Sequence, residues 1–164
     1  MHLRRLNLAD APLMLQWMHD ETVVAHMGAN FAAKTLTDCE HFITASLTDE
    51  ENLHLAVADE SGEYMGTVSL KHIDRTRLTA EFAITVRSAA MGRGFSRFGM
   101  AAILEKGIHE MGLREIYWCV SPYNLRAVRF YDKSGYRHTT RVPTHVLTPY
   151  SEQQELVWYV YTGE

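Results

Sequence analysis

The sequence has few cysteines and no residue spacing typical of a bound metal. Only two cysteines, Cys39 and Cys119, occur among the 164 residues. There is no CxxC pair, and the nine histidines lack the HExxH spacing that places two imidazoles on one helical face. We therefore expect no disulfide framework and no metal, and we predict that both cysteines are buried, reduced thiols.

Excess positive charge and long apolar runs are also missing. Acidic residues outnumber lysine and arginine by 20 to 16, a net charge of −4, so the basic surface of a nucleic-acid-binding protein is not expected. No stretch approaches the roughly 20 apolar residues of a membrane span. The opening MHLRRLNLAD turns polar before a secretory signal could form. These absences favour small molecules or peptides as partners, without nucleic acid or membrane, and the cytoplasm as the location.

What remains is the composition of an ordinary globular protein. The chain is 46% hydrophobic and 22% charged, which is close to the averages for such proteins. Its 164 residues are enough to close a single hydrophobic core. No linker, low-complexity tract or internal repeat divides the sequence. We expect one domain over residues 1–164.

The spacing of apolar residues predicts a mixture of strands and helices. Strands are expected at residues 2–7, 53–59, 64–73, 78–86, 114–120, 136–142 and 154–161, with 53–86 folded as an antiparallel meander. The first helix is expected after an N-cap of Asn7 and Asp10, and the second after a capping box of Thr37 and Glu40. A third helix ends at Gly112, and a fourth covers about 125–135. Residues 20–34 have no sustained period and are predicted to form a loop.

The stretch AAMGRGFSRFGM, residues 89–100, lies where a predicted strand gives way to a predicted helix. The first N–H groups of a helix lack partners and carry part of a positive charge. Gly92 and Gly94 permit unusual backbone angles and leave room for a ligand, while Arg93 and Arg97 add full charges. The pattern predicts a phosphate site, although it matches neither the Walker motif nor GxGxxG. The alternative is a tight glycine turn without a ligand.

The stretch VSPYNLRAVRFYDKSGY, residues 120–136, is a second motif. Together the two motifs resemble the signatures of the GNAT superfamily of N-acetyltransferases, (Q/R)xxGx(G/A) and NxxAxxxYxxxG(F/Y). The residues matching the second signature are Asn124, Ala127, Tyr131, Gly135 and Tyr136. The resemblance implies an α/β (α+β) GNAT fold, with a central, mixed, mostly antiparallel sheet of about six to seven strands flanked by about four helices.

The resemblance implies that acetyl-coenzyme A is the acyl donor. Its pantetheine arm would lie along Ile84, Thr85 and Val86 like an added strand, where strand 78–86 and the next strand splay apart. Asn124 would hydrogen-bond the arm, and the glycine turn would hold the pyrophosphate. The residues implied in pyrophosphate binding are Met91, Gly92, Arg93, Gly94, Phe95, Ser96 and Arg97.

One residue departs from the family pattern. Ala89 stands where the family usually has Gln or Arg, three residues before the first glycine. Alanine has no polar side chain, so this position offers the cofactor no side-chain hydrogen bond. Arg87 and Arg93 are the candidates to replace it.

The resemblance further implies direct transfer, in which a bound amine attacks the thioester and no covalent acyl-enzyme forms. Tyr131 matches the family's general acid, and a core aromatic is the alternative. A phenol of pKa about 10 is a weaker acid than a thiol of about 8.5, so complete proton transfer costs roughly 2 kcal/mol, which hydrogen-bond donation partly avoids.

Glu81 lies on the opposite face of its strand from Phe82. It resembles the glutamate in the AE(F/L/I)x(I/V) strand of polyamine and ribosomal-protein acetyltransferases. We expect it to act as a base through water, or after attack has acidified the nitrogen, with a surface glutamate as the alternative.

The acceptor is not defined by the sequence beyond a primary amine: a protein N-terminus, an amino sugar, a polyamine and other small amines all remain open. His72, Asp74, His26 and Glu21 are polar residues near the expected acceptor side, for which ordinary surface roles are favoured. Cys119 is the only candidate for a covalent route. A non-catalytic acyl-CoA-binding module is the alternative function, and the exposed edges of a mixed sheet suggest a homodimer.

Overall fold

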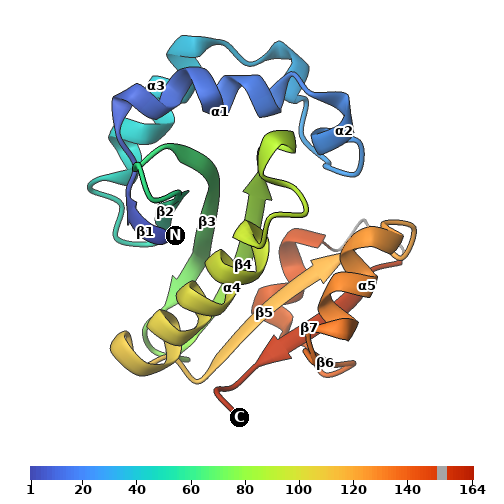
Figure 1. Cartoon of the computed structure of the whole chain (residues 1–164). Helices are drawn as coiled ribbons and strands as arrows, with labels where there is room; N and C mark the ends of the chain where they lie inside the picture. Colours follow the sequence, from blue (N-terminus) through green and yellow to red (C-terminus); the bar gives the residue numbers. More distant parts are fainter. Residues whose placement is uncertain (151–154) are drawn as a thin grey trace.

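The computed structural model describes residues 1–150 and 155–164, which form a seven-stranded sheet in the order β1-β2-β3-β4-β5-β7-β6 (Figure 1). Neighbouring strands are antiparallel except for β4 and β5, which are parallel. The strands are β1 (His2–Arg5), β2 (Leu53–Ala58), β3 (Tyr64–Asp74), β4 (Thr79–Val86), β5 (Glu115–Val120), β6 (Arg137–His138) and β7 (Val157–Tyr161). The predicted mixed, mostly antiparallel sheet is confirmed.

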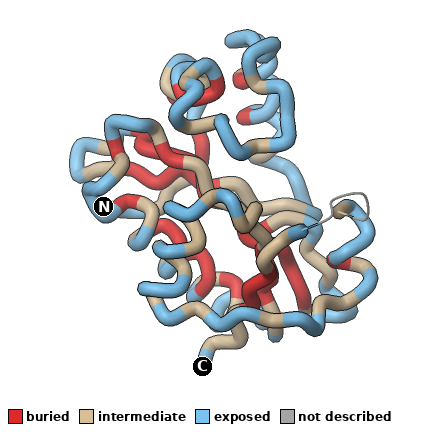
Figure 2. The backbone as a smooth tube through the Cα atoms, turned by 90° about the vertical axis from the view of Figure 1, so that its right-hand side faces the viewer, coloured by how far each residue is buried: buried red, intermediate tan, exposed pale blue. Residues whose placement is uncertain are grey.

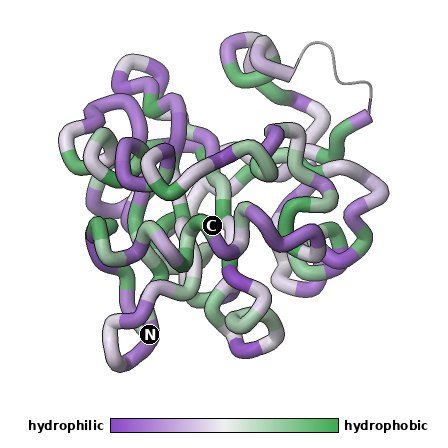
Figure 3. Tube along the Cα trace, turned by 90° about the horizontal axis from the view of Figure 1, so that it is seen from above, coloured by the Kyte–Doolittle hydropathy of each residue, from purple (hydrophilic) through white to green (hydrophobic). Residues whose placement is uncertain are grey.

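Four helices of eight or more residues flank this sheet in the described ranges, together with two single turns, α2 and α6. The α-helices are α1 (Ala11–Met18), α2 (Glu21–Val24), α3 (Leu36–Ser46), α4 (Phe95–Glu105), α5 (Leu125–Lys133) and α6 (Thr144–Leu147). Short 3-10 turns lie at η1 (Leu8–Asp10), η2 (Phe31–Ala33), η3 (Ser88–Ala90) and η5 (Thr148–Tyr150), and α4 continues into a π-helical turn, η4 (Lys106–Glu110). Figure 3 shows hydrophobic and hydrophilic residues interspersed along the chain, and each long helix turns its apolar residues toward the sheet.

The two faces of the sheet carry different helices. Because successive strand residues point to opposite sides, neighbouring residues of one strand pack against different helices. In β2, Leu55 and Val57 belong to the core cluster that includes the buried side of α4. Ala56, between them, belongs to the cluster of α1 and α3. Helix α5 lies on the α4 face, where Phe130 and Tyr131 pack against the first cluster. The buried parts of the chain are concentrated in the strands between these layers (Figure 2).

Gly99 sets the distance between α4 and the sheet. A Cβ at this position would lie 2.7 Å from Val57 Cγ2 and 3.4 Å from Ile84 Cδ1. The first of these distances is shorter than a normal van der Waals contact, so only glycine lets the helix approach this closely. The close packing fixes the start of α4 relative to β4, which positions the glycine turn between them.

The two predicted helix caps fare differently. At Asn7 the cap is confirmed, since its side chain accepts from the Ala9 N–H at 2.9 Å and Asp10 accepts from the Asn7 N–H at 2.8 Å. The predicted box of Thr37 and Glu40 is wrong, because the box is formed two residues earlier, by Thr35 and Asp38. Both pairs share the same hydroxyl-x-x-acid chemistry. The helix therefore begins at Leu36.

Two further predictions need correction, and a third begins outside the described residues. Residues 20–34 are not all loop, because the Asp20 side chain accepts from the Thr22 N–H at 3.0 Å and caps α2, and η2 follows. The strand predicted at 136–142 is wrong beyond His138. Pro143 lacks an N–H for a sheet ladder and instead stands before α6. The strand predicted at 154–161 begins at residue 154, which lies outside the described residues, and is observed as β7.

Candidate active site

Strands β4 and β5 pair only at their first residues and then separate. Their parallel register is Thr79 with Glu115, Ala80 with Ile116 and Glu81 with Tyr117. Beyond these pairs, β4 continues beside β3 as far as Val86, whereas β5 continues beside β7 (Figure 1). We call the place where the strands separate, between 82–86 of β4 and 118–120 of β5, the fork. The predicted splay is therefore present, and the β4 edge that includes residues 84–86 has no strand partner there among the described residues.

The glycine turn lies at the end of β4 and opens α4. Gly92 and Gly94 have φ angles of +75° and +88°, in the left-handed region, and Gly94 is the N-cap of α4. A Cβ at Gly92 would meet nothing within 4 Å, and one at Gly94 only Met1 Cε at 3.6 Å. Within residues 1–150 and 155–164, no acceptor contacts the N–H groups of Gly94, Phe95 and Ser96. The turn thus presents free donors at a helix N-terminus, the arrangement that binds phosphate.

The structure distinguishes the two arginines proposed to replace the missing side chain at Ala89. Arg93 Nη1 donates to the Ala89 carbonyl at 3.1 Å, so its guanidinium lies beside that position. Arg87 is bound elsewhere: its guanidinium donates to Gln16 at 3.2 Å and to the Tyr64 carbonyl at 3.0 Å. Of these two arginines, Arg93 is therefore the one whose guanidinium lies at the glycine turn.

The start of α5 faces the glycine turn and contributes polar groups. Asn124 accepts from the Ala127 N–H at 3.2 Å through Oδ1, so its carbonyl oxygen caps the helix and its amide N–H₂ group is the part left for a ligand. Arg126 Nη1 lies 3.2 Å from Met91 Sδ, which brings an exposed cation to the turn. Arg97 is exposed on the first turn of α4. The sequence analysis did not identify Arg126, because only the fold brings α5 next to residue 91.

Tyr131 lies on α5 within a group of aromatic rings below the fork. Its ring centroid is 5.6 Å from that of Trp118 and 5.1 Å from that of Tyr159. Trp118 is the first β5 residue after the last pair with β4. Burial, and then the nearby Cys119 thiol, raise the pKa of Tyr131 to about 12. The hydroxyl therefore keeps its proton at neutral pH and can donate a hydrogen bond or the proton itself.

Glu81 is the last β4 residue paired with β5, and its side chain is buried. It points away from Phe82, as predicted, but the residue is only 5% exposed, so the surface alternative is wrong. Its carboxylate accepts from the Tyr150 hydroxyl and lies 3.8 Å from Lys71 Nζ and 4.0 Å from His72 Nε2. A buried carboxylate in the middle of a fold needs such compensation.

The Cys119 thiol is close enough to both candidate catalytic residues to interact with them electrostatically. Burial and then the Glu81 carboxylate raise the pKa of the Cys119 thiol to about 12, while the same thiol contributes to the raised pKa of Tyr131. Glu81 and Cys119 point to one face of the sheet, and Tyr131 lies on α5 at the other face. The two candidate residues therefore lie on opposite faces of the sheet, Glu81 at the last pair before β4 and β5 separate. A thiol with this pKa is a poor nucleophile.

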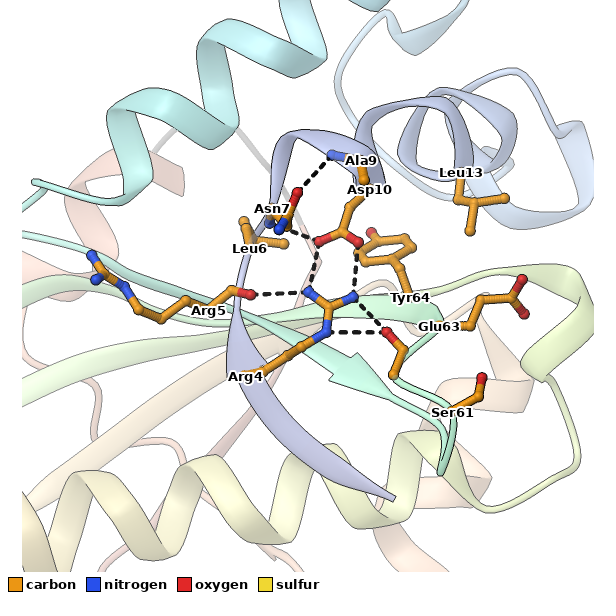
Figure 4. Close-up of a pocket in the computed structure, with 11 residues that line it drawn as sticks. Arg4, Arg5, Leu6, Asn7, Ala9, Asp10, Leu13, Ser61, Glu63 and Tyr64 are labelled. Carbon is orange, nitrogen blue, oxygen red and sulfur yellow. Dashed lines mark hydrogen bonds and ion pairs between the residues drawn. The ribbon is translucent and has the colours of Figure 1, made fainter.

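A small pocket of about 20 Å³ lies against Glu81, with Thr79, His72, His145 and Pro149 in its wall. Its volume corresponds to about one water molecule. A larger pocket of about 550 Å³ lies elsewhere, beside β1 and η1 (Figure 4).

The larger pocket is built around a structural ion pair. Arg4 donates to both Asp10 oxygens at 2.9 and 2.8 Å and to the Gly62 carbonyl at 2.8 Å (Figure 4). Asp10 also accepts from the Asn7 N–H. These contacts use the polar groups of the pocket to join β1 to the β2–β3 turn, so this pocket contributes to the fold.

The remaining polar candidates have exposed positions or stabilise a turn. Asp74 accepts from the Arg77 N–H at 2.8 Å and stabilises the turn before β4. Glu21 and His26 are exposed at α2 and just after it. Among the described residues, no group of three His, Cys, Asp or Glu residues could hold a metal ion. Within the same residues, no helix combines the length and the apolar character needed to cross a membrane.

Comparison with known families gives a match over most of the chain. The family described as "Acetyltransferase (GNAT) domain" matches residues 1–137 of this chain. The chain belongs to the GNAT acetyltransferase family. The matched range contains the glycine turn, the fork and Tyr131, so the resemblance seen in the two motifs is confirmed.

Individual GNAT relatives are distant. The chain is 25% identical over 103 residues to spermidine N(1)-acetyltransferase of Vibrio cholerae, a match that covers 63% of this chain and 60% of that enzyme's length. It is 22% identical to aminoglycoside N(6')-acetyltransferase type 1 of Klebsiella pneumoniae over 87% of this chain and 76% of that one. The crystal structure of spermidine N-acetyltransferase from Vibrio cholerae in complex with CoA and spermine superposes with a TM-score of 0.81. That likeness covers 98% of this chain and 94% of the other at 19% identity, which establishes the GNAT fold.

Proposed function

We propose that this GNAT protein transfers an acetyl group from acetyl-coenzyme A to a primary amine, directly and without an acyl-enzyme. The observation that carries the proposal is the fork, where Glu81 approaches from one face of the sheet and Tyr131 from the other. A noncatalytic binding module would need the donors of the glycine turn but not this pair. We also propose that residues 1–164 act as one domain.

Acetyl-coenzyme A fits the groups that this chain leaves open. The free N–H groups and open Cβ positions of the glycine turn suit a pyrophosphate, with Arg93, Arg97 and Arg126 beside it. Residues 84–86 on the unpaired edge of β4 suit the amide-bearing pantetheine arm. The coenzyme supplies a thioester whose carbonyl carbon can be attacked by an amine.

Tyr131 would donate from its hydroxyl toward the leaving sulfur. In water, transfer from a phenol of pKa about 10 to a thiolate of pKa about 8.5 costs about 2 kcal/mol. At the fork, burial and then the Cys119 thiol raise the pKa of Tyr131 to about 12. Burial would also raise the pKa of a sulfur that leaves beside Tyr131, which offsets the higher pKa of the donor. Donation by Tyr131 is therefore feasible at neutral pH.

Glu81 would accept the proton that the attacking amine loses. An amine of pKa about 10.4 is neutral in only about one molecule in 2,500 at pH 7, so it gains from a nearby proton acceptor. The pocket of about 20 Å³ against Glu81 has room for about one water molecule, which could carry the proton to the carboxylate.

The names of the relatives give the first two compounds to test, spermidine and an aminoglycoside. A simple amino sugar and a peptide with a free N-terminus represent the other acceptors that the sequence leaves open. A dodecameric form is known for the spermidine N-acetyltransferase of Vibrio cholerae. For this chain we retain a homodimer as the proposal, and light scattering would test it. Free thiols at Cys39 and Cys119 agree with the cytoplasm as the proposed location.

The test is a panel of these amines with acetyl-coenzyme A, followed by release of free thiol. Wild-type protein is expected to turn over with at least one amine, and Tyr131→Phe to lose about 10²-fold or more in kcat while still binding coenzyme A. Tyr161→Phe is the matched control, because its hydroxyl donates to Glu105 away from the fork. Coenzyme binding without turnover of any amine would instead support the binding module.

A further inference from the structure

We propose that Tyr150 is a positioning residue for Glu81, an inference that rests on the proposed function of Glu81 as the proton acceptor. Tyr150 is separated from Glu81 by 69 residues in sequence and was not predicted to have any role. Its hydroxyl donates to Glu81 Oε1 from η5, on the sheet face opposite α4 and α5.

Tyr150 engages one oxygen of the carboxylate and leaves the other available. Lys71 Nζ approaches the same oxygen, Oε1, at 3.8 Å. Among residues 1–150 and 155–164, the group recorded beside Oε2 is His72 Nε2, at 4.0 Å, which is beyond hydrogen-bond distance. The pocket with room for about one water molecule borders Glu81 and His72. Tyr150 thereby selects Oε2 as the oxygen that can accept a proton.

The segment that carries Tyr150 is anchored on both sides of the site. Its ring packs edge-on against Trp158 of β7, with centroids 5.3 Å apart. Earlier in the segment, His145 Nε2 lies 2.9 Å from Thr79 Oγ1 of β4. Val146, only 8% exposed, packs in the cluster of Tyr117 and Trp158. These contacts to β4 and β7 hold the hydroxyl at the carboxylate.

Tyr150 can orient the carboxylate but cannot replace it as a base. Burial, and then the hydrogen bond to Glu81 and its negative charge, raise the pKa of Tyr150 far above that of a free phenol. The hydroxyl thus keeps its proton throughout the pH range in which the enzyme would work. A donor that never ionises restricts Glu81 to one rotamer without competing for the proton of the amine.

Tyr150→Phe removes the hydroxyl and retains the ring on Trp158. The matched control is Tyr117→Phe, because the Tyr117 hydroxyl donates to a different carboxylate, Glu115, from the same face of the sheet. We expect Tyr150→Phe to lower kcat about tenfold, with KM for acetyl-coenzyme A and the calorimetric Kd for coenzyme A unchanged. Tyr117→Phe is expected to stay within about twofold of wild type in all three quantities.

A double-mutant cycle with Glu81→Gln separates the inference from the function on which it rests. If Tyr150 acts through Glu81, adding Tyr150→Phe to Glu81→Gln causes almost no further loss of kcat. Losses that multiply would overturn the positioning role. If Glu81→Gln lowers kcat but Tyr150→Phe does not, only the role of Tyr150 is wrong. If Glu81→Gln leaves kcat unchanged, the role proposed for Glu81 itself is wrong.

A second variant checks that the effect comes from the lost donor. Tyr150→His keeps a ring and an N–H that can donate toward Glu81. We expect its kcat to lie between those of Tyr150→Phe and wild type, with melting temperatures of both variants close to that of Tyr117→Phe. Equal kcat values for Tyr150→Phe and Tyr150→His would contradict a hydrogen-bonding role. This conclusion would hold even with a lower stability of Tyr150→Phe.

Discussion

Replacing Gly94 by alanine tests whether the glycine turn is the coenzyme cradle. Gly94 has a φ of +88° and lies at the N-cap of α4. Gly62, in the turn between β2 and β3, has the same φ of +88° and provides a matched control. An added Cβ would meet nothing within 4 Å at Gly62 and only Met1 Cε at 3.6 Å at Gly94. Neither substitution creates a steric clash.

The expected effects separate stability from binding. A left-handed alanine costs about 1–2 kcal/mol, so both variants should lose about that much free energy of unfolding. Only Gly94→Ala puts a methyl group where the N–H donors face a phosphate. Losing a hydrogen bond to a charged group costs about 1.5–3 kcal/mol, which corresponds to about tenfold to hundredfold weaker binding.

Chemical denaturation measures the stability term, and calorimetric titration with coenzyme A measures binding. The cradle predicts equal losses of stability in Gly94→Ala and Gly62→Ala but weaker coenzyme binding only in Gly94→Ala. Equal coenzyme affinity in the two variants would refute the assignment of the phosphate site to this turn.

Three further predictions follow from charge and protonation. Arg126→Gln should weaken coenzyme A binding about two- to fivefold at low salt, and titrations at rising ionic strength should show the difference shrinking. Lys71→Met removes the cation 3.8 Å from Glu81 Oε1, so competition assays should show kcat/KM for spermidine rising several-fold relative to a monoamine. Burial raises the pKa of Tyr64 to about 12; its contribution to stability, about 3 kcal/mol, is fully present below pH 10 and lost as the pH rises to 12. Denaturation at several alkaline pH values should show a smaller loss in Tyr64→Phe.

The sequence predicted those parts of the site that depend on short-range patterns. Gly92 and Gly94 stand in a strand-to-helix turn, and Tyr131 has a fixed spacing from Asn124. Both motifs could therefore be recognised from the sequence alone. Local chemistry was less decisive where it occurred twice. Thr35 with Asp38 and Thr37 with Glu40 offer the same capping atoms, and only the packing of α3 selects the first pair.

The unpredicted parts depend on contacts between distant residues. Lys71 lies beside Glu81 because of the register between β3 and β4, which a one-residue shift would abolish. Tyr150 reaches Glu81 from η5, a single 3-10 turn that follows the one-turn helix α6, and neither turn is long enough to show a periodicity. The burial of Glu81 follows from the same segment, which covers the face on which a surface glutamate was the alternative.

The central claim is direct transfer of an acetyl group from acetyl-coenzyme A to an amine at the fork. In the most direct test, the protein is incubated with acetyl-coenzyme A and the best amine of the panel. The masses of the amine and of the intact protein are then measured by mass spectrometry. We predict that the amine gains one acetyl group and that Cys119 stays unmodified. An acetylated Cys119 that passes its acetyl group to the amine, or an amine that remains unchanged while the coenzyme is bound, would contradict the claim.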